Sequence, residues 1–255
     1  MPIINRVADL MPEIAAWRRD IHAHPEVLFD VHRTAGVVAE KLKAFGCDEV
    51  VTGIGRTGVV GVIKGKKDGA SRTIGLRADM DALPITEATG LPYQSTTPGK
   101  MHACGHDGHT AMLLGAAKYL AETRNFAGNA VVIFQPAEEG GGGGREMVKD
   151  GMMDRFGVEE VYGMHNYPGL PVGDFAIRPG PIMAAADRIY IDIEGLGGHA
   201  ARPHVSIDSV LVSAQIINQI QSIVSRNVNP LESAVSRSAR YTLAPRTTSS
   251  RRRRG

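Results

Sequence analysis

Apolar and polar positions divide the chain into segments with two different periods. Apolar side chains recur every three or four residues in 4–24 and in 108–120, which predicts two helices with one buried face each. Another helix is predicted for about 34–45, because Gly46 follows it as a stop signal. Short apolar runs predict strands at 50–51, 57–64, 73–77, 129–135 and 160–165.

The run 129–135, N-A-V-V-I-F-Q, is apolar at consecutive positions, which is typical of a strand buried on both faces. Residues 160–165 are expected to form one more buried strand. Strands that alternate with helices predict an α/β fold with a largely parallel sheet. We assign residues 1–181 to this domain.

A change of pattern after residue 181 predicts a second domain. Residues 188–194 alternate strictly between apolar and polar, as in a strand with one solvated face. Residues 203–228 follow with one long apolar stripe at helical spacing. We expect 182–235 to be the start of an α+β domain, and we treat 236–255 as an Arg-rich tail.

Composition excludes several classes of protein. With 43% hydrophobic residues, the 255-residue chain has enough apolar material for a core, unlike a disordered chain or a disulfide-stapled miniprotein. No apolar run reaches the roughly 18 residues of a membrane span, and charged residues interrupt the first fourteen positions, where a signal peptide is apolar. Because only Cys47 and Cys104 are present, we expect no disulfide framework and a cytoplasmic protein.

The net charge of +2 is unevenly distributed. Seven arginines and no acidic residue fall in 236–255, which leaves 22 basic and 27 acidic residues in 1–235, a net charge of −5. An arginine run can indicate a nucleic-acid-binding tail or a nuclear signal. The acidic body and the single aromatic residue of this tail, Tyr241, argue against nucleic acid as a partner.

The segment 101–110, M-H-A-C-G-H-D-G-H-T, has the highest density of candidate ligands. Cys104 and His106 lie two residues apart, so a loop can turn both toward one centre, and thiolate and imidazole are good ligands for zinc or a similar metal. One alternative is a helix N-terminus with incidental histidines. Another is a nucleophilic or redox role for Cys104, which requires a thiol of low pKa and a base.

Three more polar clusters follow predicted strands. Glu138 and Glu139 come directly after strand 129–135, where ligands bind in open α/β sheets. Because adjacent side chains point in different directions, we expect one to hold a metal and the other to act as general base, although an acidic turn would have the same sequence. His165 ends strand 160–165, and either a ligand or a structural histidine fits that position.

The fourth cluster, Asp79 and Asp81, follows strand 73–77 and can orient the ligands or form a turn before Pro84. Together with Asp79 or Asp81 as orienting residues, the candidate ligands Cys104, His106, Glu139 and His165 are more than one closed tetrahedral site requires. Two ions about 3.5–4 Å apart could use them in a hydrolytic site.

Six motifs, in this order, carry a resemblance to a known family. They are R-R-D-I-H-A-H-P-E (18–26), L-R-A-D-M-D-A-L-P (76–84), M-H-A-C-G-H-D-G-H-T (101–110), F-Q-P-A-E-E-G (134–140), M-H-N-Y-P (164–168) and G-x-G-G-H-A-A-R-P-H (195–204). From residue 5 to about 235 the chain resembles the amidohydrolase branch of the two-metal carboxypeptidase-like peptidases. That branch contains hippurate hydrolases, N-acyl-amino-acid amidohydrolases and plant auxin-conjugate hydrolases.

The resemblance implies roles for individual residues. Glu138 matches the general base, Asp81 the aspartate that orients the metal site, and His199 a lid histidine that supports the tetrahedral intermediate. The metal ligands of the family match Cys104, His106, Glu139 and His165. Relatives outside this branch carry His where this chain has Asp79, which we leave unassigned. The implied fold is an α/β catalytic domain with an inserted α+β lid and dimerisation domain.

The implied activity is metal-dependent hydrolysis of the amide bond of N-acyl amino acids, with two divalent ions (Mn, Zn, Co or Ni) as cofactors. The full-length family implies a homodimer or homotetramer, and the lack of a long apolar run leads us to expect no membrane partner. Two alternatives stay open: an aminopeptidase acting on unblocked peptides, and a non-catalytic truncated remnant.

The resemblance stops at about residue 235. Family members run well beyond residue 255 and supply a last metal-binding histidine near their C-terminus. We therefore expect both domains to be incomplete here, metal to bind weakly, apolar surface to be exposed, and activity to be low or absent.

The tail suggests a hypothesis about its origin. With permitted codons, residues 241–254 read two bases out of frame as H-A-G-T-A-Y-N-V-I-P-E-T-A, which resembles a lid segment of the family. We interpret 236–255 as a frameshifted sequence, a hypothesis that the coding DNA would decide.

Overall fold

The computed structural model describes residues 4–69, 71–183, 185, 187, 189–238 and 242. The chain divides into two compact units, Met1–Ala176 and Ile177–Gly255, which are taken separately below. Most of the Arg-rich tail, about which the frameshift hypothesis was made, lies outside the described residues. The assignment of the second unit as the start of a lid stays a prediction.

The first unit is built on a five-stranded sheet with the order β1-β2-β4-β3-β5. Its strands are β1 (Glu49–Ile54), β2 (Gly58–Lys64), β3 (Thr73–Asp79), β4 (Asn129–Gln135) and β5 (Glu160–Gly163). β4, β3 and β5 run parallel, whereas β1 and β2 pair antiparallel to each other and β2 to β4. The α/β prediction is confirmed, with a parallel part that contains the candidate site.

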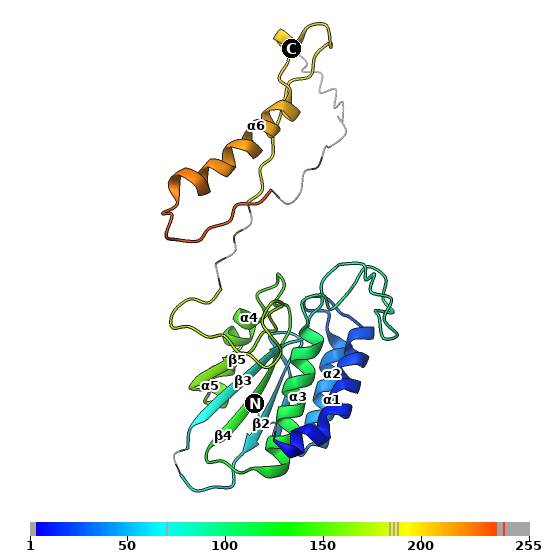
Figure 1. Ribbon diagram of the computed structural model, residues 1–255, viewed down its shortest axis with the longest axis vertical. Coiled ribbons are helices and arrows are strands. Elements are labelled where there is room, and N and C mark those ends of the chain that lie inside the picture. Colours follow the sequence, from blue (N-terminus) through cyan, green and yellow to red (C-terminus); the bar gives the residue numbers. More distant parts are fainter. Residues whose placement is uncertain are drawn as a thin grey trace, which may run out of the picture. The chain divides into compact units, whose positions relative to one another are not determined.

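Three helices pack on one face of this sheet (Figure 1): α1 (Asn5–Ala23), α2 (His32–Ala44) and α3 (His106–Thr123). The apolar stripe predicted for the first helix is buried, with Leu10, Ile14, Trp17 and Ile21 all at most 9% exposed. Ala130, Val132 and Phe134 of β4 face the same core. The helices α1 and α2 therefore hold α3, and with it the loop before its first residue, firmly against the sheet.

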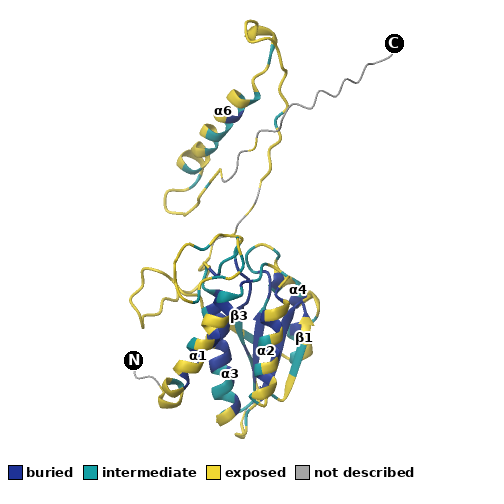
Figure 2. Cartoon of the chain, turned by 90° about the vertical axis from the view of Figure 1, so that its right-hand side faces the viewer, coloured by how far each residue is buried: buried dark blue, intermediate teal, exposed yellow. Residues whose placement is uncertain are grey.

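The other sheet face is covered by the short helices α4 (Gly143–Lys149) and α5 (Met152–Phe156), which the sequence did not predict. Val131 and Ile133 of β4 point to this side, against Met147 and Met152. In Figure 2 the centre of the sheet is largely dark blue, whereas the edge strand β1 is partly exposed. The prediction that 129–135 is buried on both faces is confirmed.

The prediction of a buried strand at 160–165 is wrong in its burial. The strand is formed over Glu160–Gly163, but it lies at the edge of the sheet, and Val161 and Tyr162 are 45% and 56% exposed. It pairs with β3 on one side only. The apolar side chains of β5 therefore do not indicate that the strand lies in the centre of the sheet.

In the second unit the predicted helix 203–228 is divided. Residues Pro203–Val205 form a 3-10 turn, α6 spans Ser209–Ser222 and a π-helical turn covers Ile223–Asn227. Asp208 caps α6 by accepting the backbone N–H groups of Val210 and Leu211, which explains why the helix begins later than predicted.

The strand predicted at 188–194 is not formed: residues 189–194 have no regular structure. A strand needs a partner for its backbone hydrogen bonds, and the only bridge in the described part of this unit joins Leu196 to Ile207. Large apolar side chains stay exposed along the unit, among them Ile177, Ile189, Leu231 and Val235. None of the helices in the described residues has the length and apolar character that a bilayer crossing requires.

Candidate metal centre

The predicted clusters meet at one edge of the sheet. β3, β4 and β5 are parallel, so their carboxyl ends lie together. Asp79 ends β3, and the N-terminus of α3 packs beside it because the Thr110 hydroxyl donates to the Asp79 carbonyl oxygen. The residues gathered here are Asp79, Asp81, Cys104, His106, Glu138, Glu139 and His165.

His106 lies at the centre of this group and is fully buried. Its Nδ1 donates to the carbonyl oxygen of Asp81 over 2.7 Å, which fixes the proton on Nδ1. Nε2 is left with no hydrogen-bond partner among the described residues. A buried ring nitrogen with a free lone pair is what a metal ligand presents before its ion is bound.

Three carboxylates surround that free nitrogen. The Nε2 of His106 lies 3.6 Å from Oδ2 of Asp79, 3.8 Å from Oε1 of Glu139 and 4.0 Å from Oε2 of Glu138. These distances are too long for hydrogen bonds but suit groups arranged around one cation. Oε1 of Glu139 is likewise buried without a partner in the described chain.

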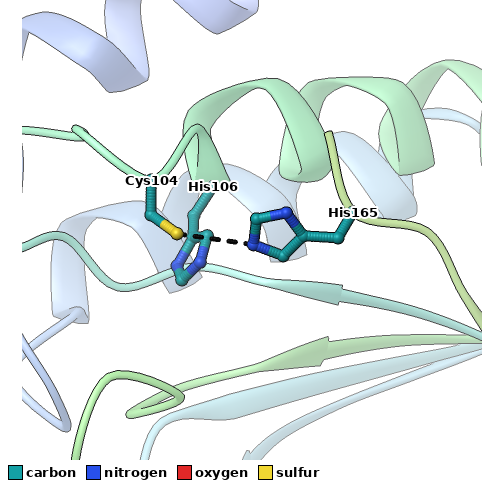
Figure 3. A group of neighbouring side chains, drawn as sticks. All are labelled: Cys104, His106 and His165. Carbon is teal, nitrogen blue, oxygen red and sulfur yellow. Dashed lines mark hydrogen bonds between the residues drawn. The ribbon is translucent and has the colours of Figure 1, made fainter. Parts of the chain in front are cut away.

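Cys104 and His165 complete the group from opposite sides (Figure 3). The Sγ of Cys104 lies 3.4 Å from Nε2 of His165, and His106 lies beside both. The Nδ1 of His165 donates to the carbonyl oxygen of Asn166 over 2.7 Å, so its Nε2 carries the lone pair that accepts from the Cys104 thiol. Cys104, His106 and His165 each offer a ligand atom within 4.8 Å of the others.

A strained turn presents the two glutamates. Ala137 has a φ of 50°, a left-handed conformation that costs a non-glycine residue about 1–2 kcal/mol. The turn aims the backbone N–H groups of Glu138 and Glu139 at the two carboxylate oxygens of Asp81, at 3.0 and 3.1 Å. Both glutamate side chains reach the His106 nitrogen, and they differ in burial: the side chain of Glu138 is 32% exposed and that of Glu139 is 18%.

The electrostatics of the group favour added positive charge. Burial raises the pKa of the Cys104 thiol, and the negative charges of Glu139, Glu138 and Asp79 raise it further, to about 12. Burial alone would lower the pKa of His106, but its contacts with Asp81 and the charge of Asp79 raise it. Carboxylate charge contributes to both shifts, and a bound cation would neutralise that charge.

Asp79 stays ionised within this group. Burial would raise its pKa, yet the hydrogen bond from His109 and the charges of Arg77 and His106 lower it to about 2. The Nη1 of Arg77 lies 2.8 Å from Oδ2 of Asp79. Asp79, which the sequence left unassigned, is therefore a buried anion with a hydrogen-bond donor at each carboxylate oxygen.

His199 lies in the second unit, where it is exposed. Its Nδ1 accepts the backbone N–H of Ala201 over 3.1 Å, which leaves Nε2 on the solvent side of the ring. The structure thus brings together all the predicted site residues that belong to the first unit. His199 belongs to the second unit and is described separately.

A second buried polar network, which the sequence did not predict, links α1 to the first turn of α3. Asp107 is fully buried and accepts from Arg18 and from Nδ1 of His22, at 3.0 and 2.9 Å. The Nε2 of His22 contacts Glu87 at 3.2 Å, which ties the loop between β3 and α3 to α1. Arg18 and His22 belong to the motif R-R-D-I-H-A-H-P-E, but no pattern in the sequence pairs that motif with Asp107.

Comparison with known proteins agrees with this geometry. Residues 75–248 match the model of Peptidase family M20/M25/M40. The chain is 48% identical over 235 residues to the hippurate hydrolase of Campylobacter jejuni, covering 92% of this chain and 60% of that protein. It is 46% identical over 235 residues to an N-acyl-L-amino acid amidohydrolase of Geobacillus stearothermophilus, covering 91% of this chain and 62% of that protein. The chain thus spans about 60% of the length of these relatives.

Solved structures show the same fold. A protein from methicillin-resistant Staphylococcus aureus superposes with a TM-score of 0.73 at 37% identity, over 90% of this chain and 60% of that one. A Bacillus subtilis protein described as a dinuclear metal-binding peptidase of the M20 family gives a TM-score of 0.63 at 41% identity, over 68% of this chain and 48% of that one. A family match over most of the chain, with this identity and fold, leaves one assignment: the chain belongs to Peptidase family M20/M25/M40.

Proposed function

We propose that this site hydrolyses the amide bond of N-acyl amino acids with the help of two divalent metal ions. One observation carries the proposal: the buried Nε2 of His106 has no partner in the described chain, and carboxylates face it on three sides. Such a nitrogen costs free energy unless a cation or a proton occupies it. The names of two relatives, a hippurate hydrolase and an N-acyl-L-amino acid amidohydrolase, suggest the class of substrate.

The donor set fits divalent metal ions. Thiolate and imidazole are typical zinc ligands, imidazole also suits nickel, and carboxylate suits manganese. Cys104, His106, Glu139 and His165 would hold the ions, because each has a ligand atom directed into the group. When bound, two such ions polarise a substrate carbonyl and make a water easier to deprotonate.

Glu138 is the proposed general base. Its side chain is more exposed than that of Glu139, so it can contact a water and the leaving group on the open side. It would take a proton from the attacking water and return that proton to the amine nitrogen as the amide bond breaks. Asp81 would hold its backbone in place through the 3.0 Å bond from the Glu138 N–H.

His199 is the proposed donor to the oxygen that becomes negative during attack. Its support comes from the G-G-H-A-A motif and from an Nε2 that is not engaged by the Ala201 contact. Because the chain has only two cysteines, both free, we place the enzyme in the cytoplasm, and by analogy with the full-length family we expect a homodimer or homotetramer.

The test combines a metal count with a choice of substrates. The purified chain is loaded separately with Mn, Zn, Co and Ni, dialysed, and analysed for metal by plasma emission. Hippurate and N-acetyl amino acids are then compared with unblocked dipeptides. We expect weak binding of at most two metal ions per chain, low hydrolytic activity, and release of amino acids from N-acylated substrates only.

Two results would replace this function with another. Cleavage of unblocked dipeptides alone would indicate an aminopeptidase. Stoichiometric metal binding with no hydrolysis of either substrate would identify the chain as a non-catalytic form.

A further inference from the structure

His109 is a buried histidine of α3 that lies behind the candidate metal centre, one helical turn after His106. It is 3% exposed, and both of its ring nitrogens are engaged. Nδ1 lies 2.7 Å from Oδ1 of Asp79, and Nε2 lies 3.0 Å from the backbone nitrogen of Asn166. Neither contact enters the function proposed above.

These contacts argue that His109 is not itself a ligand. Asp79, His106 and His109 are near enough to one another to hold an ion. A metal, however, needs a lone pair, and the buried anion Asp79 fixes the Nδ1 proton of His109 while the N–H of Asn166 uses the lone pair on Nε2. His106 differs, because its Nε2 has no partner among the residues that the structure describes.

The peptide unit around Asn166 is held from two sides. His109 accepts its N–H, and the Nδ1 of His165 donates to its carbonyl oxygen over 2.7 Å. The amide oxygen of the Asn166 side chain lies 2.5 Å from the same His109 nitrogen, so a doubly protonated ring would donate to it instead. In either protonation state the ring links Asp79 to Asn166.

This link matters because few other contacts hold the segment that contains His165 and Asn166. His165 follows the edge strand β5, and residues 161–170 are all exposed. The rings of His109 and His165 are 4.5 Å apart between centroids and nearly perpendicular, at 68°. The orientation of His165 in Figure 3, with Nε2 toward Cys104, therefore depends on a buried residue of another element.

We propose that His109 is a positioning residue, which is held by Asp79, anchors the backbone of Asn166, and thereby fixes the ring and tautomer of His165 for metal binding. The proposal rests on the metal centre proposed above. It assigns a task to Asp79 as well, since that carboxylate fixes the orientation of the His109 ring.

Two substitutions separate the two ends of the His109 ring. In His109→Asn the amide can still donate to Asp79, but it is too short to reach Asn166. In His109→Gln the longer side chain places an amide oxygen where Nε2 was, so it can accept the Asn166 N–H. We expect His109→Gln to behave like the unaltered chain and His109→Asn to resemble His165→Ala.

The first measurement is a cobalt titration of the full chain, followed through the thiolate-to-cobalt charge-transfer band of Cys104. Loss of a group that orients a ligand lowers metal affinity by about 10–100-fold, and we expect that loss for His109→Asn but not for His109→Gln. In the His165→Ala background, His109→Asn should cause no further loss, because both changes remove the same interaction.

The second measurement needs no metal. In the metal-free chain with 15N-labelled histidine, the NMR spectrum of the imidazoles should show His165 with its proton on Nδ1, and only His109→Asn should change that signal.

Each outcome is decisive for one of the two proposals. If the unaltered chain binds no cobalt, the metal centre fails, while the tautomer of His165 still tests the role of His109. If His109→Gln and His109→Asn lose affinity equally, His109 is a ligand rather than a positioning residue. If the two variants lower thermal stability alike, with cobalt affinity and the His165 signal unchanged, its role is only structural. Either result overturns the inference.

Discussion

Asp81 accepts the backbone N–H of Glu139 on its Oδ2 at 3.1 Å and thereby fixes the turn after β4 to the end of β3. The other oxygen of the same carboxylate accepts the Glu138 N–H at 3.0 Å. One buried side chain thus sets the backbone position of both glutamates. Asp81 does not face the free Nε2 of His106. Its backbone carbonyl instead accepts a hydrogen bond from Nδ1, on the other side of the ring.

We predict that Asp81→Asn weakens metal binding and hydrolysis together. The asparagine amide has one oxygen and one NH2 group, so one of the two backbone N–H groups would face a donor instead of an acceptor. Loss of such an orienting group lowers metal affinity or activity by about 10–100-fold. Cobalt titration measures this effect, and unchanged affinity in Asp81→Asn would contradict the assigned role.

Glu138 and Glu139 should respond differently to the same change. Glu139→Gln is expected to lower cobalt affinity by at least tenfold. The buried Oε1 of Glu139 has no hydrogen-bond partner in the described structure, and a bound ion would supply one. Glu138→Gln should keep the metal and lose turnover, since the amide cannot accept a proton. Plasma emission measures the metal content of each variant, and hippurate hydrolysis measures its activity. Loss of metal in Glu138→Gln would show that Glu138 is a ligand.

Metal affinity should rise with pH. Because burial and the nearby carboxylates raise the pKa of Cys104 to about 12, the thiol is protonated in the metal-free chain at neutral pH. Binding requires the thiolate and releases this proton, so each unit of pH increase should strengthen binding about tenfold through this group. Cobalt titrations between about pH 7 and 8.5, with the bound cobalt measured by plasma emission after dialysis, give the slope.

The control for this slope is Cys104→Ser. It removes the thiol, so its slope should be lower by about one proton. Equal slopes for the two chains would show that Cys104 is not a ligand.

Local patterns in the sequence were enough to predict most elements of the first unit. β4 occupies the residues of its apolar run, because a strand covered on both faces is apolar at every position. The clusters after β3, β4 and β5 could also be expected to meet, since parallel strands end at one edge. These conclusions needed only residue type and order.

The remaining features depend on contacts that are distant in the sequence. Val161 and Tyr162 are apolar although β5 is an edge strand, so their pattern could not reveal their exposure. The pairing of Asp107 with His22 joins residues 85 positions apart. Residues 189–194 have a strand pattern without a strand, because no pairing partner is present in the described part of their unit.

Asp107 should contribute strongly to stability. It is a fully buried carboxylate that accepts from both Arg18 and His22, and Asp107→Asn would remove the charge those donors face. Breaking a buried charged pair costs about 3–5 kcal/mol, and we expect the lower part of that range because Arg18 is half exposed. Urea unfolding measures the free energy of unfolding.

A matched control is available on the surface of α1. Asp20 pairs with Arg33, with both side chains partly exposed, so Asp20→Asn should change stability by less than about 1 kcal/mol. Similar changes in the free energy of unfolding for Asp20→Asn and Asp107→Asn would show that burial of the Asp107 network adds nothing to stability.

Gly105 offers a last test of how closely the ligand segments fit together. It precedes α3 with a φ of 91°, and a Cβ at this position would lie 2.5 Å from Oδ1 of Asn166. Gly105→Ala would therefore strain the backbone by about 1–2 kcal/mol and also displace the side-chain amide of Asn166, which contacts His109. We expect both a lower free energy of unfolding and weaker cobalt binding.

Gly108→Ala is the same chemical change three residues further on, where a Cβ meets no atom within 4 Å. Because Gly108 lies inside α3, alanine should stabilise the helix by up to about 1 kcal/mol and leave cobalt binding unchanged. If cobalt affinity falls in Gly105→Ala and not in Gly108→Ala, the close approach of Asn166 to the α3 N-terminus is part of the metal centre. Equal cobalt affinity in the two variants would mean that the centre tolerates displacement of Asn166.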